Sequence, residues 1–438
     1  MKISVFGLGY VGAVTLACLA RDGHEVIGVD IDAGKLDMIR NGRSPIVEVG
    51  VQELMGAGVA RGKVTVTCDV GQAIAHSDLS FVAVGTPGNA NGSQDLRALL
   101  RLAENIGTAL RTQRRYHVVV VRSTVQPGTI ESQVLPLLEQ HSGKRAGPDF
   151  GLCFQPEFLR EGSAIRDYDH PPYTVIGTHS EAAAATLWEV FGHLPCEFLV
   201  TRIGTAECLK YACNAFHALK ITFANEIGRI AQACEVDSHE VMRLLGLDAQ
   251  LNISTAYLRP GFAFGGSCLP KDLRALLDVA KRRDVEVPML ASLLPSNRAQ
   301  IELAVDAVLA DGGRAVGMLG LSFKPGTDDL RESPMVALAE RFIGKGLTLR
   351  IFDPGVSLSR LVGANRRYIE ESIPHIGSLM SDDLGEVVGS SDIVIVAMAD
   401  RELLAEARQY TRPEQLILDL VNMPERAGLR GRYRGICW

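Results

Sequence analysis

The 438-residue sequence has no run of about 18 consecutive apolar residues, which is the length that a membrane-spanning helix needs. It also has no block of five or six basic residues, and 45 Lys and Arg against 51 Asp and Glu leave a net charge of −6. Aromatic residues make up 6% of the chain, too few for a surface that stacks bases. We therefore expect no membrane partner and no nucleic-acid partner.

The nine cysteines are odd in number and widely spaced, with no C-x-x-C pair and no histidine at metal-ligand spacing. This pattern predicts reduced thiols, no metal site and a cytoplasmic protein. The first twenty residues, apolar up to Ala17–Ala20, would also suit a secretory leader. Against a leader, three glycines at fixed offsets and the strand pattern that follows belong to a folded domain.

The composition is that of a globular protein, with 47% hydrophobic residues, 22% charged residues and a mean hydropathy of +0.12. At roughly 150 residues per domain, the length suggests about three domains. In the first third of the chain, short β-branched runs alternate with helical patterns, as in a parallel sheet covered by helices. The expected strands are Ile3–Phe6, Val26–Asp30, Val64–Thr67, Leu79–Val84 and His117–Arg122.

The pattern becomes helical from Thr201 to Gly246, with a break where Ser238 is the expected cap of the next helix. Strands then return at Val316–Leu319, Thr348–Asp353, Ile393–Ala397 and Leu416–Leu420. We predict an α/β protein with two Rossmann-like, doubly wound parallel-sheet domains, residues 1–200 and 301–438. An all-helical connector with a long central helix, residues 201–300, joins them.

The two ends echo each other, because residues 75–84 (AHSDLSFVAV) align with residues 389–397 (GSSDIVIVA). This suggests a duplicated unit. The alternative is that any two α/β domains share such fragments.

The sequence GLGYVG at residues 7–12 follows a strand and opens a helix, the setting that the G-x-G-x-x-G fingerprint requires. Gly7 allows the tight turn, Gly9 lets a pyrophosphate approach the backbone, and Gly12 lets the helix pack on the strand. Asp30 ends the second strand, where its carboxylate can accept both ribose hydroxyls, which favours NAD over NADP. Lys35 lies one helical turn further on, where it can ease the negative field or contact the adenosine ribose. The alternative is a glycine-rich turn without a ligand.

Two threonines end neighbouring strands at the carboxyl edge of the predicted sheet. Thr86 follows the fourth strand and Thr124 the fifth. Ligands bind at this edge in open α/β sheets, so both are candidate cofactor contacts. The alternative is an ordinary turn threonine.

The segment PGFAFGGSCLPKD at residues 260–272 places Cys268 just before a helix, with Pro270 in its first turn and Lys271 beside it. A helix N-terminus and a lysine both favour a thiolate, whose unperturbed pKa of about 8.5 falls in such surroundings. We therefore predict that Cys268 is a nucleophile and that the other eight cysteines are inert buried thiols.

A polar stripe runs along the expected connector helix, and the positions beside it are small or apolar. The stripe contains Glu207, Lys210, Asn214, His217 and Asn225. We expect the helix to be buried nearly all round with one polar seam; a solvated helix face is the alternative. Glu157 and Glu161 follow another strand, four residues apart on one side of an expected helical turn. One of them can act as a base or hold a water; the alternative is an ordinary exposed turn.

Seven segments together resemble the nucleotide-sugar 6-dehydrogenases from end to end. They are residues 7–12, 85–87, 123–129, 156–162, 223–226, 264–272 and 323–334. Within this family, residues 257–264 and 435–438 are most similar to the branch that oxidises GDP-mannose.

The resemblance implies a primary alcohol oxidised to a carboxylate by two hydride transfers to two NAD molecules. Cys268 would trap the aldehyde as a thiohemiacetal, which becomes a thioester and is hydrolysed. Lys210 and Asn214 would stabilise oxyanions, Asp272 and Thr124 would hold a water, and Glu157 would assist hydrolysis. The implied nucleotide-sugar contacts are Glu161, Lys210, Asn214, His217, Asn225, Tyr257, Arg259, Phe262, Gly265 and Lys324. The implied NAD contacts are Gly7, Gly9, Tyr10, Val11, Gly12, Asp30, Lys35, Thr86, Thr124, Lys271 and Arg331.

The resemblance also implies a homodimer formed through the connector helix, with Arg259 delivered to the partner's site. The second sheet carries no G-x-G-x-x-G, which fits a diphosphate held by Lys324 rather than a second dinucleotide. Ala256 departs from the aromatic residue expected in the mannose branch. The implied product, GDP-mannuronate, feeds alginate-type exopolysaccharide synthesis. UDP-glucose or a UDP-N-acetylhexosamine stays open as substrate, as do a non-catalytic NAD sensor and a two-electron hydroxyacid dehydrogenase.

Overall fold

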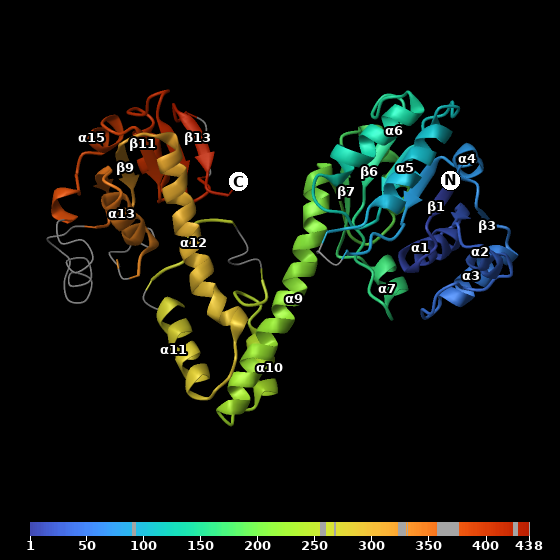
Figure 1. Ribbon diagram of the computed structural model, residues 1–438, viewed down its shortest axis with the longest axis horizontal. Helices are drawn as coiled ribbons and strands as arrows, with labels where there is room; N and C mark the ends of the chain where they lie inside the picture. The colour runs from blue at the N-terminus through green and yellow to red at the C-terminus, as the bar shows by residue number, and fades with distance from the viewer. Residues whose placement is uncertain are drawn as a thin grey trace. The chain divides into compact units, whose positions relative to one another are not determined.

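The computed structural model describes residues 1–89, 93–254, 260–266, 269–322, 330, 332–356, 376–423 and 428–437 (Figure 1). The chain divides into two compact units, Met1–Ala218 and Leu219–Trp438. Within the described residues, no helix is long and apolar enough to cross a membrane.

The first unit is built on an eight-stranded sheet with the order β3-β2-β1-β4-β5-β6-β7-β8. The six strands β1 to β6 are parallel, whereas β7 pairs antiparallel with β6 and parallel with β8. The strands are β1 (Lys2–Phe6), β2 (Glu25–Val29), β3 (Val64–Thr67), β4 (Leu79–Val82), β5 (Val118–Val121), β6 (Gly151–Phe154), β7 (Tyr173–Thr178) and β8 (Glu197–Thr201). The five strands expected in the first third are all present. The reversed strands β7 and β8 were not predicted.

Helices cover both faces of this sheet because the central strands are buried on both sides. In β5, Val118 and Val120 belong to one core while Val119 and Val121 belong to the other, and all four are at most 1% exposed. One face packs against α1 (Tyr10–Arg21), α2 (Ala33–Arg40), α3 (Val51–Ala60), α7 (Ala164–Asp169) and α8 (Glu181–Phe191). The other packs against α4 (Val70–Ala75), α5 (Arg97–Leu110), the π-helical turn η1 (Ile130–Val134) and α6 (Leu135–Ser142).

The connector is helical, as predicted, and contains a 31-residue helix, α9 (Ile203–Ala233). The helices α10 (Ser238–Leu247), α11 (Leu269–Arg282) and α12 (Pro288–Asp311) follow it. The side chain of Asp237, not of Ser238, caps α10, since its carboxylate accepts the N–H groups of His239 and Glu240. The prediction of a Ser238 cap was wrong by one residue: Asp237 has the extended backbone of a cap, and Ser238 is already helical.

The second unit contains a five-stranded, fully parallel sheet with the order β10-β9-β11-β12-β13. Its strands are β9 (Ala315–Leu319), β10 (Thr348–Phe352), β11 (Ile393–Val396), β12 (Leu416–Asp419) and β13 (Arg432–Gly435). Around it lie α13 (Pro334–Gly344), η2 (Ile376–Ser378), α15 (Leu384–Gly389) and α16 (Arg401–Ala407). Separate cores lie on its two faces. The predicted class, two Rossmann-like parallel sheets joined by a helical connector, is therefore confirmed.

Candidate active site

The glycine-rich turn after β1 has three glycines with three different surroundings. Gly7 has φ +88°, and a Cβ there would lie 2.9 Å from the backbone of Ala83. At Gly12 a Cβ would lie 1.8 Å from the carbonyl oxygen of Gly7, so helix and turn touch directly. At Gly9 a Cβ would meet nothing within 4 Å. Only at Gly9 does the missing side chain leave open space that a ligand can fill.

The open space at Gly9 faces the start of α1, where no side chain caps the first N–H groups. Uncapped N–H groups at a helix N-terminus attract phosphate oxygens. Tyr10 and Val11 are the first residues of α1, so their N–H groups belong to this set. The arrangement fits the pyrophosphate of a dinucleotide.

The carboxylate of Asp30 is held in place at the end of β2. One oxygen accepts the N–H of Leu8 at 2.7 Å, and the other accepts the N–H of Asp32 at 3.0 Å. The Nζ of Lys35 lies 3.7 Å from the carboxylate. A carboxylate fixed in this way can accept ribose hydroxyls, and it would repel a 2′-phosphate.

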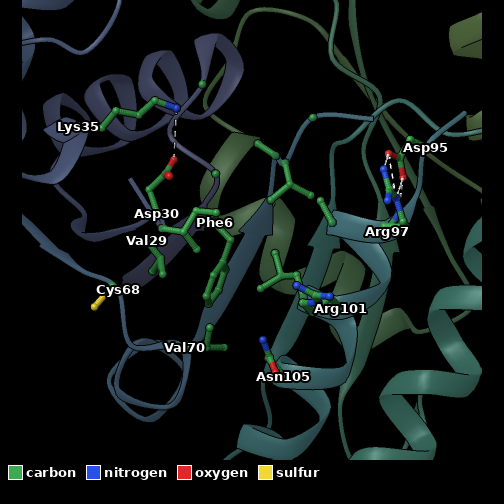
Figure 2. Close-up of a pocket in the computed structure, with 18 residues that line it drawn as sticks. Phe6, Val29, Asp30, Lys35, Cys68, Val70, Asp95, Arg97, Arg101 and Asn105 are labelled. Atoms are coloured by element: carbon green, nitrogen blue, oxygen red, sulfur yellow. Dashed lines mark hydrogen bonds and ion pairs between the residues drawn. The ribbon is translucent and has the colours of Figure 1, made fainter. Parts of the chain in front are cut away.

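A cavity of about 720 Å³ opens beside Asp30. Figure 2 shows Asp30 and Lys35 joined at one side of this cavity, and Asp95 and Arg97 joined at another. Its floor is apolar, and Phe6, Val29 and Val70 contribute to it. A volume of this size suits the adenosine half of a dinucleotide.

Several residues that line the cavity were not predicted from the sequence. They are Ile31, Cys68, Val70, Asp95, Arg97, Arg101, Leu102 and Asn105. Three of them, Arg97, Arg101 and Asn105, are spaced four residues apart on the exposed face of α5. That stripe is the sequence feature by which they were recognisable.

Thr86 and Thr124 lie next to each other, as strand ends in a parallel sheet should. The hydroxyl of Thr86 donates to the carbonyl oxygen of Thr124 at 2.6 Å, and Gln94 Nε2 donates to the same oxygen at 3.1 Å. Thr86 therefore ties the loop after β4 to the loop after β5.

Lys210 and Glu157 form a pair that is almost completely buried, with 9% and 12% of their side chains exposed. Lys210 Nζ lies 3.1 Å from Glu157 Oε1 and also donates to the backbone carbonyl of Glu157. The ammonium lies 5.2 Å from the centre of the Phe158 ring. The first turns of α9 thus deliver a cation to the loop that follows β6, a place where it can stabilise negative charge.

Glu207, the first member of the predicted polar seam, has a structural task. Its two carboxylate oxygens accept the N–H groups of Gly128 at 2.6 Å and Ile130 at 2.9 Å. Burial raises the pKa of Glu207, while these two N–H groups oppose that rise. The carboxylate therefore fixes the loop of residues 123–129, which contains Thr124.

For the rest of the predicted polar seam, the structure contradicts the prediction of burial. Residues 214–222 of α9 are exposed, among them Asn214 and His217, and so is Asn225. Neither these two nor Asn225 makes a side-chain hydrogen bond to another described residue. The expectation of a helix buried nearly all round was wrong for this stretch: its small apolar residues permit burial, but the chain's own described residues do not cover them.

The segment that follows β6 is a loop rather than the expected turn of helix. Glu157 Oε2 accepts the N–H of Leu159 at 2.9 Å, which bends the chain away from a helical path. Glu161 lies exposed at the tip of this loop. The hydroxyl of Tyr10 also contacts the loop, donating towards the carbonyl of Arg160 at 3.3 Å and to Glu48 Oε2 at 2.7 Å.

In the second unit, α12 holds the glycine-rich segment 260–266 against its side. Asn297 accepts the N–H of Phe264 at 2.9 Å and donates to its carbonyl at 2.8 Å, and Gln300 donates to the carbonyl of Gly261 at 2.7 Å. A Cβ at Gly265 would lie 2.3 Å from the carbonyl oxygen of Glu332, so only glycine fits there. Phe262 packs on the core of this unit.

Asp272 and Lys271 form an exposed ion pair, 3.0 Å apart, in the first turn of α11. Pro270 lies in the same turn, as predicted. Five predicted site residues, Cys268, Tyr257, Arg259, Lys324 and Arg331, lie outside the described residues. The prediction that the other cysteines are buried holds for Cys18 and Cys153 and was wrong for Cys68, Cys208 and Cys437, which are exposed. Among the residues that the structure does describe, no three His, Cys, Asp or Glu side chains gather as metal ligands.

An open glycine turn, an uncapped helix N-terminus and a fixed carboxylate beside a cavity define a dinucleotide-binding α/β protein. Comparison with known families agrees over most of the chain. Residues 1–195 match the NAD binding domain of the UDP-glucose/GDP-mannose dehydrogenase family, residues 204–299 its central domain, and residues 317–426 its UDP binding domain.

Individual relatives resemble the chain over its full length. The GDP-mannose 6-dehydrogenases of Pseudomonas aeruginosa and Azotobacter vinelandii are 51% and 49% identical to it, each over 100% of both chains. A UDP-glucose 6-dehydrogenase of Haloferax volcanii is 35% identical over 96% of both chains. A crystal structure of a ternary complex of the Pseudomonas aeruginosa GDP-mannose dehydrogenase matches with a TM-score of 0.95, at 50% identity over 100% of both chains.

The chain belongs to the UDP-glucose/GDP-mannose dehydrogenase family. It is an NAD-dependent dehydrogenase that acts on a nucleotide sugar.

Proposed function

We propose that the chain oxidises the C6 hydroxyl of GDP-mannose to a carboxylate and so forms GDP-mannuronate, a building block of alginate-type exopolysaccharide. The observation that carries this proposal is the identity of about half of all residues, over both full lengths, with GDP-mannose 6-dehydrogenases. The buried pair of Lys210 on α9 and Glu157 on the loop after β6 supplies chemistry suited to this reaction.

When bound, NAD⁺ supplies the hydride acceptor for each of the two oxidations, so that one sugar consumes two cofactor molecules. Cys268 links the two steps. Its sulfur adds to the aldehyde carbon, the former carbonyl oxygen gains a proton, and the thiohemiacetal loses a hydride and its hydroxyl proton to become a thioester. Water then adds, the C–S bond breaks, and the acid and the thiol are released.

The other predicted catalytic residues would act on charge and water. Lys210 and Asn214 would stabilise the oxyanions, and Glu157, already paired with Lys210, would orient or deprotonate the hydrolytic water. Thr124 and Asp272 would hold an ordered water. The proposed nucleotide-sugar contacts are Glu161, His217, Asn225, Tyr257, Arg259, Phe262, Gly265 and Lys324; the proposed NAD contacts are the glycine turn, Tyr10, Val11, Asp30, Lys35, Thr86, Thr124, Lys271 and Arg331.

We also propose that the work is divided among three parts: NAD binding by residues 1–200, dimer formation and catalysis by residues 201–300, and nucleotide binding by residues 301–438. A homodimer through α9 is supported by apolar side chains left uncovered on this helix. Phe216, Leu219 and Ile221 are 40%, 45% and 63% exposed. If a second copy covers them, Leu219→Glu together with Ile221→Glu will yield a monomer in light scattering, and an unchanged dimer will contradict this interface.

A cytoplasmic location is proposed from the thiols. Eight cysteines are described, and all eight are free. Fractionation of cells that produce the protein from its natural gene would test it: recovery in the periplasm or medium would contradict it.

UDP-glucose is the second candidate substrate. It is supported by the match of residues 317–426 to a UDP binding domain and by the 35% identical UDP-glucose 6-dehydrogenase. Ala256, where the resemblance leads us to expect an aromatic residue in the mannose branch, also bears on this choice.

The decisive measurement is the number of NADH molecules formed per sugar consumed, with GDP-mannose and UDP-glucose tested side by side. We expect two NADH per GDP-mannose and a kcat/KM at least tenfold higher than for UDP-glucose. Cys268→Ser is expected to abolish acid formation and to leave NAD affinity unchanged. One NADH per sugar would indicate a two-electron enzyme, and none with either sugar would indicate a sensor.

A further inference from the structure

Glu48 lies on the segment between α2 and α3 and has no part in the site as predicted from the sequence. Its carboxylate nevertheless collects three hydrogen bonds from two other parts of the first unit. Oε2 accepts the hydroxyl of Tyr10 and the N–H of Gly162, both at 2.7 Å, and Oε1 accepts the N–H of Ala164 at 3.0 Å. One side chain thus joins the start of α1 to the loop that carries Glu161.

The segment around Glu48 inverts the usual pattern of burial. Val47 is 100% exposed and Val49 is 78% exposed, whereas the charged Glu48 between them is half-buried and turned towards the protein. Exposed valines are unremarkable singly, but an inward carboxylate between two of them is informative. Val47 and Val49 are thus left exposed while the carboxylate between them reaches the loop.

Both segments have backbones suited to this contact. Gly162 has φ +85°, which an L-residue adopts only with strain, and this turn presents its N–H to Glu48. Gly50 has φ +80°, and a Cβ there would lie 2.9 Å from Ile165 Cδ1, so the two segments pack closely. The hydrogen bond from Tyr10 and those from Gly162 and Ala164 lower the pKa of Glu48, which keeps it an acceptor at neutral pH.

A second carboxylate holds the other end of the same loop. Asp167 accepts the N–H of Arg160 at 2.9 Å and forms a two-pronged pair with its guanidinium. Glu161 therefore lies between two anchored neighbours. Glu161 makes no hydrogen bond or ion pair of its own with another described residue, so its carboxylate stays available to a ligand.

We propose that Glu48 is a positioning residue for the nucleotide-sugar loop, residues 157–164, and that the Tyr10 hydroxyl serves this loop through Glu48 rather than the cofactor. Tyr10 does not line the 720 Å³ cavity, and its hydroxyl is spent on Glu48 and Arg160, while its N–H stays free to face an anion. The proposal rests on the proposed function, because it assumes that Glu161 contacts the sugar nucleotide.

The test uses Tyr10→Phe, which removes one hydroxyl, and Glu48→Gln, which replaces one acceptor oxygen by an amide donor. Because each hydrogen bond helps to hold the loop in place, we expect the loss of one bond to raise the Kd for the sugar nucleotide a few-fold. We expect the KM and Kd for GDP-mannose to rise about three- to tenfold in Tyr10→Phe and about tenfold or more in Glu48→Gln, with the Kd for NAD changed less than twofold. The double variant is expected to be no weaker than Glu48→Gln alone, because both changes break one connection.

The matched control is Asp392→Asn in the second unit, whose carboxylate also accepts two backbone N–H groups, those of Arg314 and Ala315, both at 2.9 Å. It is expected to lower the melting temperature and to leave both affinities unchanged. A rise in the Kd for NAD equal to that for GDP-mannose, or an unchanged GDP-mannose affinity in both folded variants, would overturn the proposal.

Loop position can also be measured without substrate, by tryptic cleavage after the exposed Arg160 under native conditions. We expect cleavage to be several times faster in Glu48→Gln and unchanged in Asp392→Asn. If the wild type binds neither sugar nucleotide but the cleavage rates differ as stated, the proposed function has failed while Glu48 still positions the loop. Equal cleavage rates in wild type and Glu48→Gln would show that Glu48 does not.

Discussion

The turn after β1 and the turn after β9 are each held by the same kind of hydrogen bond, from a backbone N–H to an aspartate. In the first sheet, the N–H of Leu8 donates to Asp30 at 2.7 Å; in the second, the N–H of Leu321 donates to Asp353 at 2.7 Å. Each aspartate directly follows the neighbouring strand, β2 or β10. The same carboxylate device therefore fixes a tight turn at the same place in both sheets.

The two aspartates differ in what remains for a ligand. Asp353 also accepts the N–H groups of Ser322 at 3.0 Å and Gly355 at 2.9 Å, and it is 5% exposed. Asp30 borders the cavity of about 720 Å³ and has Lys35 beside it. The second aspartate is buried and accepts three backbone N–H groups, whereas the first accepts two and borders a cavity where it can accept ribose hydroxyls.

The helices that follow also differ. In the first sheet, α1 begins at Tyr10, within the turn, so its N–H groups reach the cavity edge; in the second, α13 begins only at Pro334, well beyond Gly320. A turn becomes a pyrophosphate site only when a helix starts inside it and a glycine leaves the approach open. The aspartate-held turn is therefore a scaffold, and the start of the helix decides its use.

Gly9→Ala should change NAD binding more than any other substitution considered below. Gly9 has φ −73° and a Cβ would meet no atom within 4 Å, so the protein should fold with unchanged stability. The new methyl group would occupy the approach to the pyrophosphate, and we expect the affinity for NAD to fall about a hundredfold or more. Titration calorimetry measures the affinity and urea unfolding the stability.

Gly320→Ala is the counterpart of this substitution. At φ +109° and 3.1 Å from Met398 Cβ, an alanine is strained, and we expect a loss of about 1–3 kcal/mol in unfolding free energy with NAD affinity unchanged. Equal effects of the two glycine variants on NAD binding would contradict the distinction between the turns.

The next effect concerns pH and another pair of equivalent positions. His117 precedes β5 and is 0% exposed, and its Nδ1 lies 3.1 Å from the carbonyl oxygen of Ser77. Gln415 precedes β12 and is also 0% exposed, and its side chain donates to the carbonyl oxygen of Ser391 at 2.7 Å. Burial lowers the pKa of His117 to about 4. Because the unfolded chain binds this proton near pH 6.5, the histidine's contribution to stability is present above that pH and is lost as pH falls towards 4, on the order of 3 kcal/mol.

His117→Gln gives the first sheet the same residue, glutamine, that the second sheet has at the equivalent position, Gln415. We expect the variant to lose the part of the acid sensitivity of the first unit that arises between pH 6.5 and 4. Urea unfolding at pH 7, 5.5 and 4, followed by Trp188 fluorescence in a Trp438→Phe background, measures this slope. An unchanged slope would show that other groups cause it.

A smaller effect is expected when each aspartate is replaced by asparagine. Asp353→Asn removes a buried carboxylate that accepts three backbone N–H groups, and we expect a loss of about 1–3 kcal/mol in unfolding free energy with unchanged NAD affinity. Asp30→Asn should weaken NAD binding about tenfold and destabilise the protein less. The same pair of titration and unfolding measurements tests both, and a reversed order would refute the assignment of their roles.

The smallest effect is expected from Lys35→Ala. Lys35 lies 3.7 Å from Asp30 with 35% of its side chain exposed, and such pairs contribute little. We expect a two- to threefold loss of NAD affinity at low salt, a smaller loss at 0.5 M salt, and no change in stability. A loss above tenfold would mean that Lys35 contributes more to the cofactor than an exposed cation can.

The sequence was sufficient for the features that depend on local pattern. The buried parallel strands, the glycine turn, Asp30 and the helical connector follow from hydrophobic period and from backbone requirements of glycine. The identity of the α10 cap did not follow, because Asp237 and Ser238 are both good caps and only the backbone angle decides between them.

Features that depend on distant contacts could not be predicted in this way. Asp95 and Arg101 reach the cavity because β4 lies beside β1, and Glu48 reaches Gly162 across more than a hundred residues. Strand β7 runs antiparallel to β6, and the hydrophobic pattern of the sequence does not indicate the direction in which two strands pair. The exposure of Phe216 on α9 is a similar case, since an apolar residue does not reveal which surface covers it.

The first turns of α9 are tied to the first sheet through side chains, Glu207 to the loop after β5 and Lys210 to the loop after β6. Because Lys210 is oriented by its contact with the loop after β6, it will lose this orientation when the sheet unfolds. On warming, loss of turnover should therefore coincide with melting of the N-terminal sheet, even while the C-terminal sheet still retains its own structure.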